Sequence, residues 1–145
     1  MAAKLKSETE KWLSDPEKFE LAMLDDTIVA LPREHAAAML ALQQKLRTLK
    51  CGLELAEVKN GKLVPAHALA MSNDIDVSAF NVVELEKEQA LGYLHREAMA
   101  FPDAPLGYLL LEYKGVPLGF VKNIGNRANN MYPAEWRIRK NPLEL

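Results

Sequence analysis

The sequence predicts an α+β fold built around a mainly antiparallel, barrel-like β-sheet (a pseudobarrel) with flanking helices. Two features of the chain indicate this class. Strand-forming segments follow one another in pairs joined by tight turns, and Asn60-Gly61 is the strongest short hairpin signal among them. Helical segments lie between these pairs, and no strand–helix–strand unit repeats along the 145 residues. A doubly wound parallel sheet is therefore not expected.

Three hairpins and one further strand are predicted. Apolar, alternating or β-branched residues flank three turns, at Asp25-Asp26, Asn60-Gly61 and Lys114-Gly115. The hairpins should therefore cover residues 19–31, 52–64 and 106–121, and the further strand should cover residues 81–85. Pro32 should end the first hairpin, because proline has no N–H to donate to a strand ladder.

Helices are predicted between these strands, at residues 7–13, 34–49 and 86–97, with a short helix or turn at 67–71. Pro16 indicates a turn or helix start, because proline is tolerated at the first helical position. The 34–49 helix has one apolar face, formed by Ala38, Leu42, Leu46 and Leu49 at spacings of four, four and three residues. We expect that face to pack on the sheet.

The expected organisation is a helical lead at residues 1–14, a hairpin–helix–hairpin lobe at 15–72 and a second lobe at 73–145. The boundary falls in a polar stretch at residues 72–78, which suits an ordinary long loop equally well. Residues 15–145 could therefore also form one compact domain.

Charge and composition exclude several classes. A net charge of −2 argues against a chain that coats nucleic acid through bulk charge, so RNA binding would require a local patch. A single cysteine allows no internal disulfide. No stretch approaches the roughly 18 apolar residues that span a membrane, and no secretory signal stands at the start. The expected location is the cytoplasm, without a membrane partner.

Residue types that carry catalysis are sparse. There is no glycine-rich loop between a strand and a helix to hold a nucleotide or S-adenosylmethionine. His35, His67 and His95 are isolated, so no metal-ligand spacing exists. Cys51 is expected to be a buried, inert side chain and His67 a hydrogen-bonded structural one. We therefore expect no catalytic residue, no cofactor and no metal in this chain.

The segment 122–140 differs from the rest of the chain. It holds five basic residues against one acid, a charge of +4, so the remaining residues together carry −6. Arginine can hold phosphates bidentately, asparagine can read base edges or 2′-hydroxyls, and aromatic rings can stack on bases. The candidate RNA-binding residues are Lys122, Asn123, Arg127, Asn130, Arg137 and Arg139.

A structural interpretation of the same segment stays open. Asparagine and glycine also serve turns, and Tyr132 and Trp136 could be at least partly buried as core anchors. For Asn130 we favour the structural role, in which its amide holds the backbone of its own loop. For Lys122 and Arg127 we favour RNA, with both side chains pointing outward.

Three motifs together resemble one family. Pro117-Leu118-Gly119, Lys122, Asn130 and Tyr132-Pro133 follow the closing motif of the PUA-like C-terminal domain of RsmF-type (Nol/Nop/Sun family) RNA cytosine-5 methyltransferases. The stretch 52–70 is similar to that family's Gly-Leu-x-Leu-Gly strand followed by Pro-Ser-His-Ala-Leu-Ala, with Ala56 and Ala66 departing from it. Residues 93–97 resemble its Tyr-Leu-Arg-Gly-Glu, with His95-Arg96 where Arg-Gly is usual. The resemblance covers residues from about 15 to 139.

The resemblance implies an accessory domain of a bacterial enzyme that methylates RNA with S-adenosylmethionine in a separate catalytic domain. The implied partners are structured RNA, ribosomal or transfer RNA, and that catalytic domain in cis or in trans. A second hypothesis is a docking module that orients the catalytic domain and has little RNA affinity of its own. An independent enzyme that uses His67 or Cys51 is disfavoured by the missing motifs.

Overall fold

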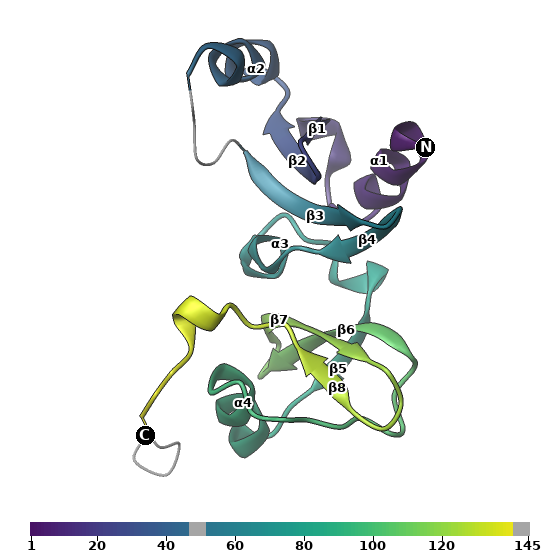
Figure 1. The fold of residues 1–145 in the computed structure, drawn as a ribbon, viewed down its shortest axis with the longest axis vertical. Helices are drawn as coiled ribbons and strands as arrows, with labels where there is room; N and C mark the ends of the chain where they lie inside the picture. Colours follow the sequence, from purple (N-terminus) through teal and green to yellow (C-terminus); the bar gives the residue numbers. More distant parts are fainter. Residues whose placement is uncertain (47–51, 141–145) are drawn as a thin grey trace. The chain divides into compact units, whose positions relative to one another are not determined.

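The computed structural model describes residues 1–46 and 52–140, and the chain divides into unit 1 (Met1–Asp76) and unit 2 (Val77–Leu145) (Figure 1). The predicted α+β class is confirmed, because each unit combines a four-stranded sheet with helices. The strands of the described residues form two open sheets, in the orders β1-β2-β3-β4 and β5-β6-β7-β8, and do not close into a barrel.

Over its described residues, unit 1 is an antiparallel sheet with three helices and one 3-10 turn (Figure 1). Its elements are α1 (Ala2–Glu10), η1 (Pro16–Lys18), β1 (Phe19–Leu24), β2 (Thr27–Pro32), α2 (Ala36–Lys45), β3 (Leu53–Lys59), β4 (Lys62–Pro65) and α3 (His67–Met71). The helix expected at 7–13 begins and ends earlier, because Lys11 and Trp12 form a turn that leads Leu13 to a bridge with Ile75.

Unit 2 packs one helix against a mixed sheet (Figure 1). Its elements are η2 (Val77–Ala79), β5 (Asn81–Glu84), α4 (Lys87–Leu94), β6 (Gly107–Tyr113), β7 (Val116–Asn123), β8 (Ala128–Asn130) and η3 (Ala134–Trp136). Helix α4 carries the chain across from β5 to β6, so these two strands pair in parallel, whereas β6, β7 and β8 pair antiparallel.

The predicted hairpins are confirmed, and their turns have the backbone geometry that the residues indicated. Asn60 and Gly61 have φ values of 52° and 73°, and Lys114 and Gly115 have φ values of 49° and 75°. Two consecutive positive φ angles define a type I′ turn, whose twist matches that of the flanking strands. The third hairpin turns at Asp25, which has a φ of 53°.

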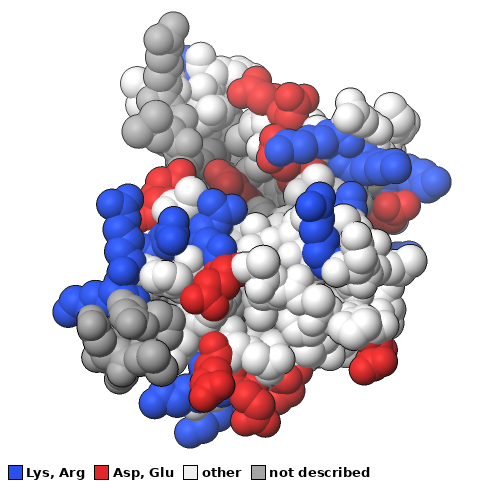
Figure 2. All heavy atoms as spheres, turned by 60° about the horizontal axis from the view of Figure 1, so that its bottom comes forward, with Lys and Arg blue, Asp and Glu red and all other residues white. Residues whose placement is uncertain are grey.

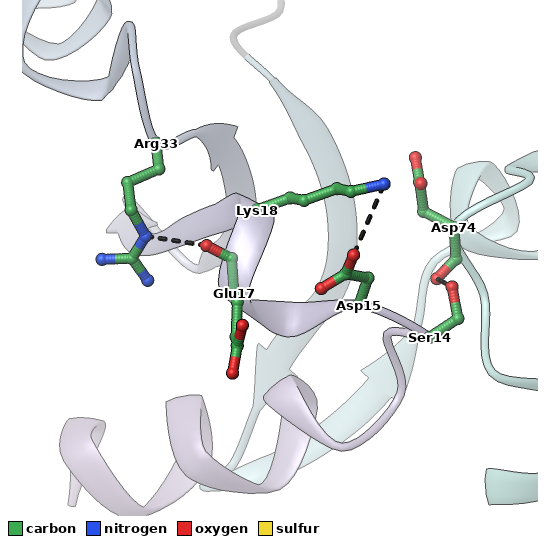
Figure 3. Close-up of polar contacts among 6 residues, drawn as sticks. All are labelled: Ser14, Asp15, Glu17, Lys18, Arg33 and Asp74. Atoms are coloured by element: carbon green, nitrogen blue, oxygen red, sulfur yellow. Dashed lines mark hydrogen bonds and ion pairs between the residues drawn. The ribbon is translucent and has the colours of Figure 1, made fainter.

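Arg33 holds the turn that Pro16 begins (Figure 3). Its Nε donates to the Glu17 carbonyl oxygen and its Nη2 to the Phe19 carbonyl oxygen, both at 2.9 Å. Its backbone N–H donates to the Lys18 carbonyl oxygen, also at 2.9 Å. One arginine thus satisfies three consecutive carbonyl groups of η1 and β1. It is a structural residue of unit 1.

The face of α2 that packs on unit 1 is not the predicted one. Ala38 is exposed, and Leu42 and Leu46 are 53% and 56% exposed, whereas Ala36 is buried against Val29 and Leu31. Leu49 lies outside the described residues. The prediction was wrong because residues 36–42 are all apolar, so helical spacing fits more than one face and cannot decide which face is buried.

We predict different outcomes for two leucine-to-alanine changes in unit 1. Leu31→Ala removes a side chain that is 0% exposed and should lower the free energy of unfolding by about 2–5 kcal/mol. Leu42→Ala removes a side chain that is mostly in water and should change that free energy by less than about 0.5 kcal/mol. Urea denaturation of both variants measures this. Equal losses of unfolding free energy in the two variants would instead support the predicted packing face of Ala38, Leu42 and Leu46.

Candidate nucleic-acid interface

The residues predicted to bind RNA lie on unit 2, in the segment 122–140 that we call the basic strip. Lys122, Arg127, Arg137 and Arg139 are all exposed, as expected. The two asparagines behave differently, since Asn123 is 2% exposed and Asn130 is half-buried. Figure 2 shows Lys and Arg side chains on the left of the face in view and a further group at its upper right, with acidic side chains between and below them.

Asn123, one of the candidate RNA-binding residues, points into unit 2 and not to solvent. Its Nδ2 lies 3.0, 3.2 and 3.1 Å from the carbonyl oxygens of Phe101, Ala104 and Pro105. Its Oδ1 accepts from the Gly125 N–H at 3.1 Å. Successive residues of a strand face opposite sides of the sheet, so the exposure of Lys122 on β7 turns Asn123 inward. Its amide ties the 101–105 loop to the end of β7.

Asn130 has the structural role that the sequence favoured. Its Nδ2 donates to the Tyr93 carbonyl oxygen at 3.0 Å, and its Oδ1 accepts from the Tyr132 N–H at 2.9 Å. The side chain thus joins β8 to the last turn of α4 and shapes the chain that follows β8. Asn129, its neighbour, is the exposed amide of this strand.

The aromatic residues of the strip form a chain of edge contacts that starts in the core. The Tyr93 and Tyr132 rings are 5.5 Å apart, and the Tyr132 and Trp136 rings are 6.4 Å apart. Tyr132 is half-buried, as predicted, whereas Trp136 is not a core anchor, because 54% of that residue is exposed. Trp136 ends the 3-10 turn η3, none of whose residues is buried, so one aromatic residue of the strip reaches solvent.

Tyr93 itself is fully buried, and its hydroxyl donates to the Phe120 carbonyl oxygen at 3.0 Å. Burial raises the pKa of Tyr93 well above its ordinary value of 10.0, and the neighbouring Tyr132 raises it further. The hydroxyl therefore stays a hydrogen-bond donor at any physiological pH. This bond fixes α4 on the sheet.

The end of the strip is tied to the C-terminal end of α4 (Figure 1). The Ile138 N–H donates to the Leu94 carbonyl oxygen at 3.0 Å, and the His95 Nδ1–H donates to the Ile138 carbonyl oxygen. Arg137 and Arg139 flank Ile138 in the chain, so both lie near this helix end. A helix C-terminus carries partial negative charge and favours such cations.

A groove of about 350 Å³ runs between the chain that leaves α4 and the edge strand β8. The backbone N–H of Ala128 donates to the Met99 carbonyl oxygen at 2.8 Å and joins the two sides. Two arginines line the groove, Arg96 and Arg127. The remaining lining residues are Glu97, Ala98, Met99, Ala128, Asn129 and Asn130.

Sequence reasoning missed Arg96 as a site residue. The strip was defined by charge along the chain, and Arg96 stands far before it, at the end of a helix. Only the packing of β8 beside the chain after α4 brings Arg96 to Arg127. The available signal was its place in 93–97, where the resembled family usually has glycine and this chain has a long cation.

Lys122 lies on the sheet surface rather than in the groove. It pairs across the sheet with Tyr108 on β6 and with Asn129 on β8, so the three side chains share one face. Its Nζ is 5.6 Å from the centre of the Tyr108 ring, a cation–π distance. Asn129 lines the groove and also pairs with Lys122, so it lies between the arginines of the groove and the lysine on the sheet surface.

Other candidate chemistry is limited in the part of the chain that the structure describes. Residues 1–46 and 52–140 contain no group of three His, Cys, Asp or Glu side chains placed to hold a metal ion. Over the same residues, every helix is too short or too polar to cross a membrane. Cys51 lies outside the described residues. His67 begins α3 and is half-buried, and burial lowers its pKa below 6.5.

The fold and the basic strip define the class of this molecule as two α+β units, of which unit 2 is PUA-like and carries the strip. Comparison with known proteins agrees. Residues 80–138 match the methyltransferase RsmF PUA domain, and residues 7–72 match the RsmF rRNA methyltransferase first C-terminal domain. The chain belongs to the RsmF family of rRNA methyltransferases, and the matched residues correspond to C-terminal domains of that family.

Curated relatives carry the name ribosomal RNA small subunit methyltransferase F. The Shewanella oneidensis protein is 33% identical over 121 residues, which is 80% of this chain and 24% of the relative. The Enterobacter sp. (strain 638) protein is 34% identical over 95 residues, 63% of this chain and 18% of the relative. The Aeromonas salmonicida protein is 33% identical over 105 residues, 70% and 21% respectively. The chain spans about a quarter or less of the length of these relatives.

We predict that Asn123→Ala destabilises unit 2 and that Asn129→Ala does not. Removing the buried amide leaves the Gly125 N–H and the carbonyl oxygens of the 101–105 loop without their partner, which should cost about 1–3 kcal/mol. Asn129 is exposed, so its loss should change stability by less than about 0.5 kcal/mol. Thermal melts of both variants measure the difference. Equal melting temperatures would contradict the structural role of Asn123.

A second prediction concerns pH. Because burial lowers the pKa of His67 in the folded chain, the unfolded chain binds its proton more readily below about pH 6.5. The neutral imidazole therefore stabilises the fold above pH 6.5, and that stability is lost as the pH falls. His67→Asn should make the free energy of unfolding depend less on pH between 7 and 5.5 than in the wild type. Parallel pH curves for the two proteins would exclude His67 as the group responsible.

Proposed function

We propose that this chain is an RNA-binding accessory region of an S-adenosylmethionine-dependent RNA cytosine-5 methyltransferase, which recognises ribosomal RNA and leaves catalysis to another domain. One observation carries the proposal: Arg127, Arg137 and Arg139 are exposed around the end of α4 and strand β8, in a chain that is otherwise acidic. The family and the printed name of the relatives support RNA, and ribosomal RNA in particular, as the ligand.

Charge distribution supports a local contact. The strip carries +4 while the rest of the chain carries −6, so the strip attracts a polyanion that the rest of the chain, taken as a whole, repels. Attraction of this kind comes from Lys and Arg contacts to phosphates, which release counterions. RNA should therefore approach unit 2 by the face that carries the strip.

Side chains on the same face can add selectivity to this attraction. Trp136 presents an exposed ring that is anchored on Tyr132, an arrangement suited to stacking one unpaired base. Asn129 offers an exposed amide for a base edge or a 2′-hydroxyl. Asn123 and Asn130, two of the predicted RNA contacts, have amides that hold the fold, so we assign the reading role to Asn129.

The remaining parts of the proposal follow from the family. The catalytic domain, in cis or in trans, supplies the S-adenosylmethionine site and the reacting groups. This chain would supply no catalytic residue, no cofactor and no metal ligand. Its proposed partners are structured RNA and the catalytic domain, and its proposed location is the cytoplasm, where ribosomal RNA is modified.

RNA binding by the wild type should weaken steeply as salt rises, and the Lys122→Ala/Arg127→Ala double variant should bind less tightly with a smaller salt dependence. Loss of two phosphate contacts should lower the slope of log affinity against log salt by about one to two. A titration of small-subunit rRNA fragments at two salt concentrations measures both effects. Lys59→Ala/Lys62→Ala, a double change on the β3–β4 hairpin of unit 1, is the charge-matched control and should bind as the wild type does.

Identical affinities for wild type and Lys122→Ala/Arg127→Ala, without salt dependence, would favour the second candidate, a docking module. One observation supports that candidate: Leu42 on α2 and Leu46, directly after it, expose apolar side chains of unit 1. The occupant would be the catalytic domain of the methyltransferase. Leu42→Gln/Leu46→Gln should then weaken association with a separately expressed catalytic domain of a relative and leave RNA affinity unchanged.

A further inference from the structure

Arg96 has a backbone conformation that its side chain disfavours. Its φ is 60°, in the left-handed region, where a residue with a Cβ costs roughly 1 kcal/mol relative to glycine. The three other non-glycine residues with positive φ among the described residues, Asp25, Asn60 and Lys114, all lie in hairpin turns. Arg96 instead follows the end of a helix, where glycine is the usual solution.

The conformation is held by the end of α4. The Arg96 N–H donates to the Tyr93 carbonyl oxygen at 3.0 Å, and the Glu97 N–H donates to the Gly92 carbonyl oxygen at 2.9 Å. These two bonds form a Schellman motif, which ends the helix and reverses the chain. The reversal directs residues 97–99 along β8 and puts Arg96 in the wall of the groove opposite Arg127. A strained residue at such a place points to a role beyond helix termination.

The charge in the groove is available to a ligand. Among the described residues, no carboxylate forms an ion pair with Arg96 or Arg127, and the polar contact of the Arg96 side chain is one bond from Nη2 to the Asn130 carbonyl oxygen at 3.3 Å. Glu97 is the acidic residue that lines the groove, and its carboxylate lies against Gly92 of α4. A Cβ added to Gly92 would be 3.0 Å from Glu97 Oε2. Two arginines therefore line the groove without an ion-pair partner among the described residues.

The groove fits a phosphodiester better than a base. Its volume of about 350 Å³ lies at the small end of ligand sites, and its walls contain no aromatic ring on which a base could stack. Guanidinium groups bind phosphate oxygens through two parallel hydrogen bonds, and the exposed Asn129 amide at the rim can donate to a 2′-hydroxyl. These are the groups of a ribose–phosphate backbone.

We propose that Arg96 and Arg127 form a clamp for the sugar–phosphate backbone of RNA in the groove between the end of α4 and β8. Arg96 lowers the stability of the fold relative to glycine at this position, but it adds a second cation to the groove. The inference rests on the proposed function and deepens it, because it assigns a binding residue outside the basic strip and a backbone contact, not a base contact, to the groove.

Arg96→Gly tests the clamp, because it should move two measurements in opposite directions. The melting temperature should rise by a few degrees, because glycine adopts a positive φ without strain. Affinity for a labelled RNA hairpin with a single-stranded loop should fall about five- to tenfold at low salt, and the salt slope should fall by about one. A residue that only ends the helix would raise the melting temperature and leave RNA affinity unchanged.

Lys114→Gly is the matched control. It also removes one cation and puts glycine at a position of positive φ, of 49°, but on the β6–β7 turn, away from the groove residues. Its RNA affinity should stay within twofold of wild type. Arg96→Asn gives a second variant, because asparagine tolerates this conformation, and it should weaken RNA binding as glycine does.

The outcomes separate the two proposals. If Arg96→Gly and Arg96→Asn both bind the hairpin as the wild type does, while Lys122→Ala/Arg127→Ala binds it less tightly, the clamp is wrong and the proposed function stands. If the wild type shows no salt-dependent affinity for RNA, the proposed function itself fails. If Lys114→Gly weakens binding as much as Arg96→Gly, net charge explains the loss and the clamp is again overturned.

Discussion

The arrangement of the candidate interface depends on Tyr93, in the last turn of α4. Its buried hydroxyl donates to the Phe120 carbonyl oxygen on β7, which fixes the helix on the sheet. Its own carbonyl oxygen accepts from Asn130 Nδ2 on β8 and from the Arg96 N–H. One residue thereby sets the positions of the edge strand, of the groove and of the left-handed turn. A buried tyrosine with both polar ends satisfied can do this because unpaired polar groups in a core are costly.

The two halves of the basic strip are attached to this framework by different means. Arg127 precedes the edge strand β8, whose pairing with β7 and bridge to Met99 place it beside the groove. Arg137 and Arg139 are positioned by Ile138 between them, whose backbone is hydrogen-bonded to the end of α4. The arginines of the strip are thus held close to two elements, the end of α4 and the edge strand β8. In an acidic chain, such gathering is what allows selective attraction of a polyanion.

The asparagines show how one residue type serves two purposes in one segment. Asn123 and Asn130 use both ends of their amides on backbone groups of unit 2, while Asn129 leaves its amide in solvent. Strand alternation separates Asn129 from Asn130, and it separates Asn123 from Lys122. A list of polar residues from a basic segment therefore mixes contacts with the fold and contacts with a ligand.

The sequence by itself determined the α+β class, the three hairpins, the helix after β5 and the family, because these depend on local turn chemistry and on motif order. Asn60-Gly61 and Lys114-Gly115 specify their turns whatever surrounds them. Only the tertiary structure decided which face of α2 is buried, that Asn123 points inward, that Trp136 reaches solvent, and that Arg96 joins Arg127. Each of these depends on which side of an element meets a distant neighbour. An all-apolar helix such as residues 36–42 carries no local signal of that choice, and neither does an arginine that meets its partner only through the packing of β8.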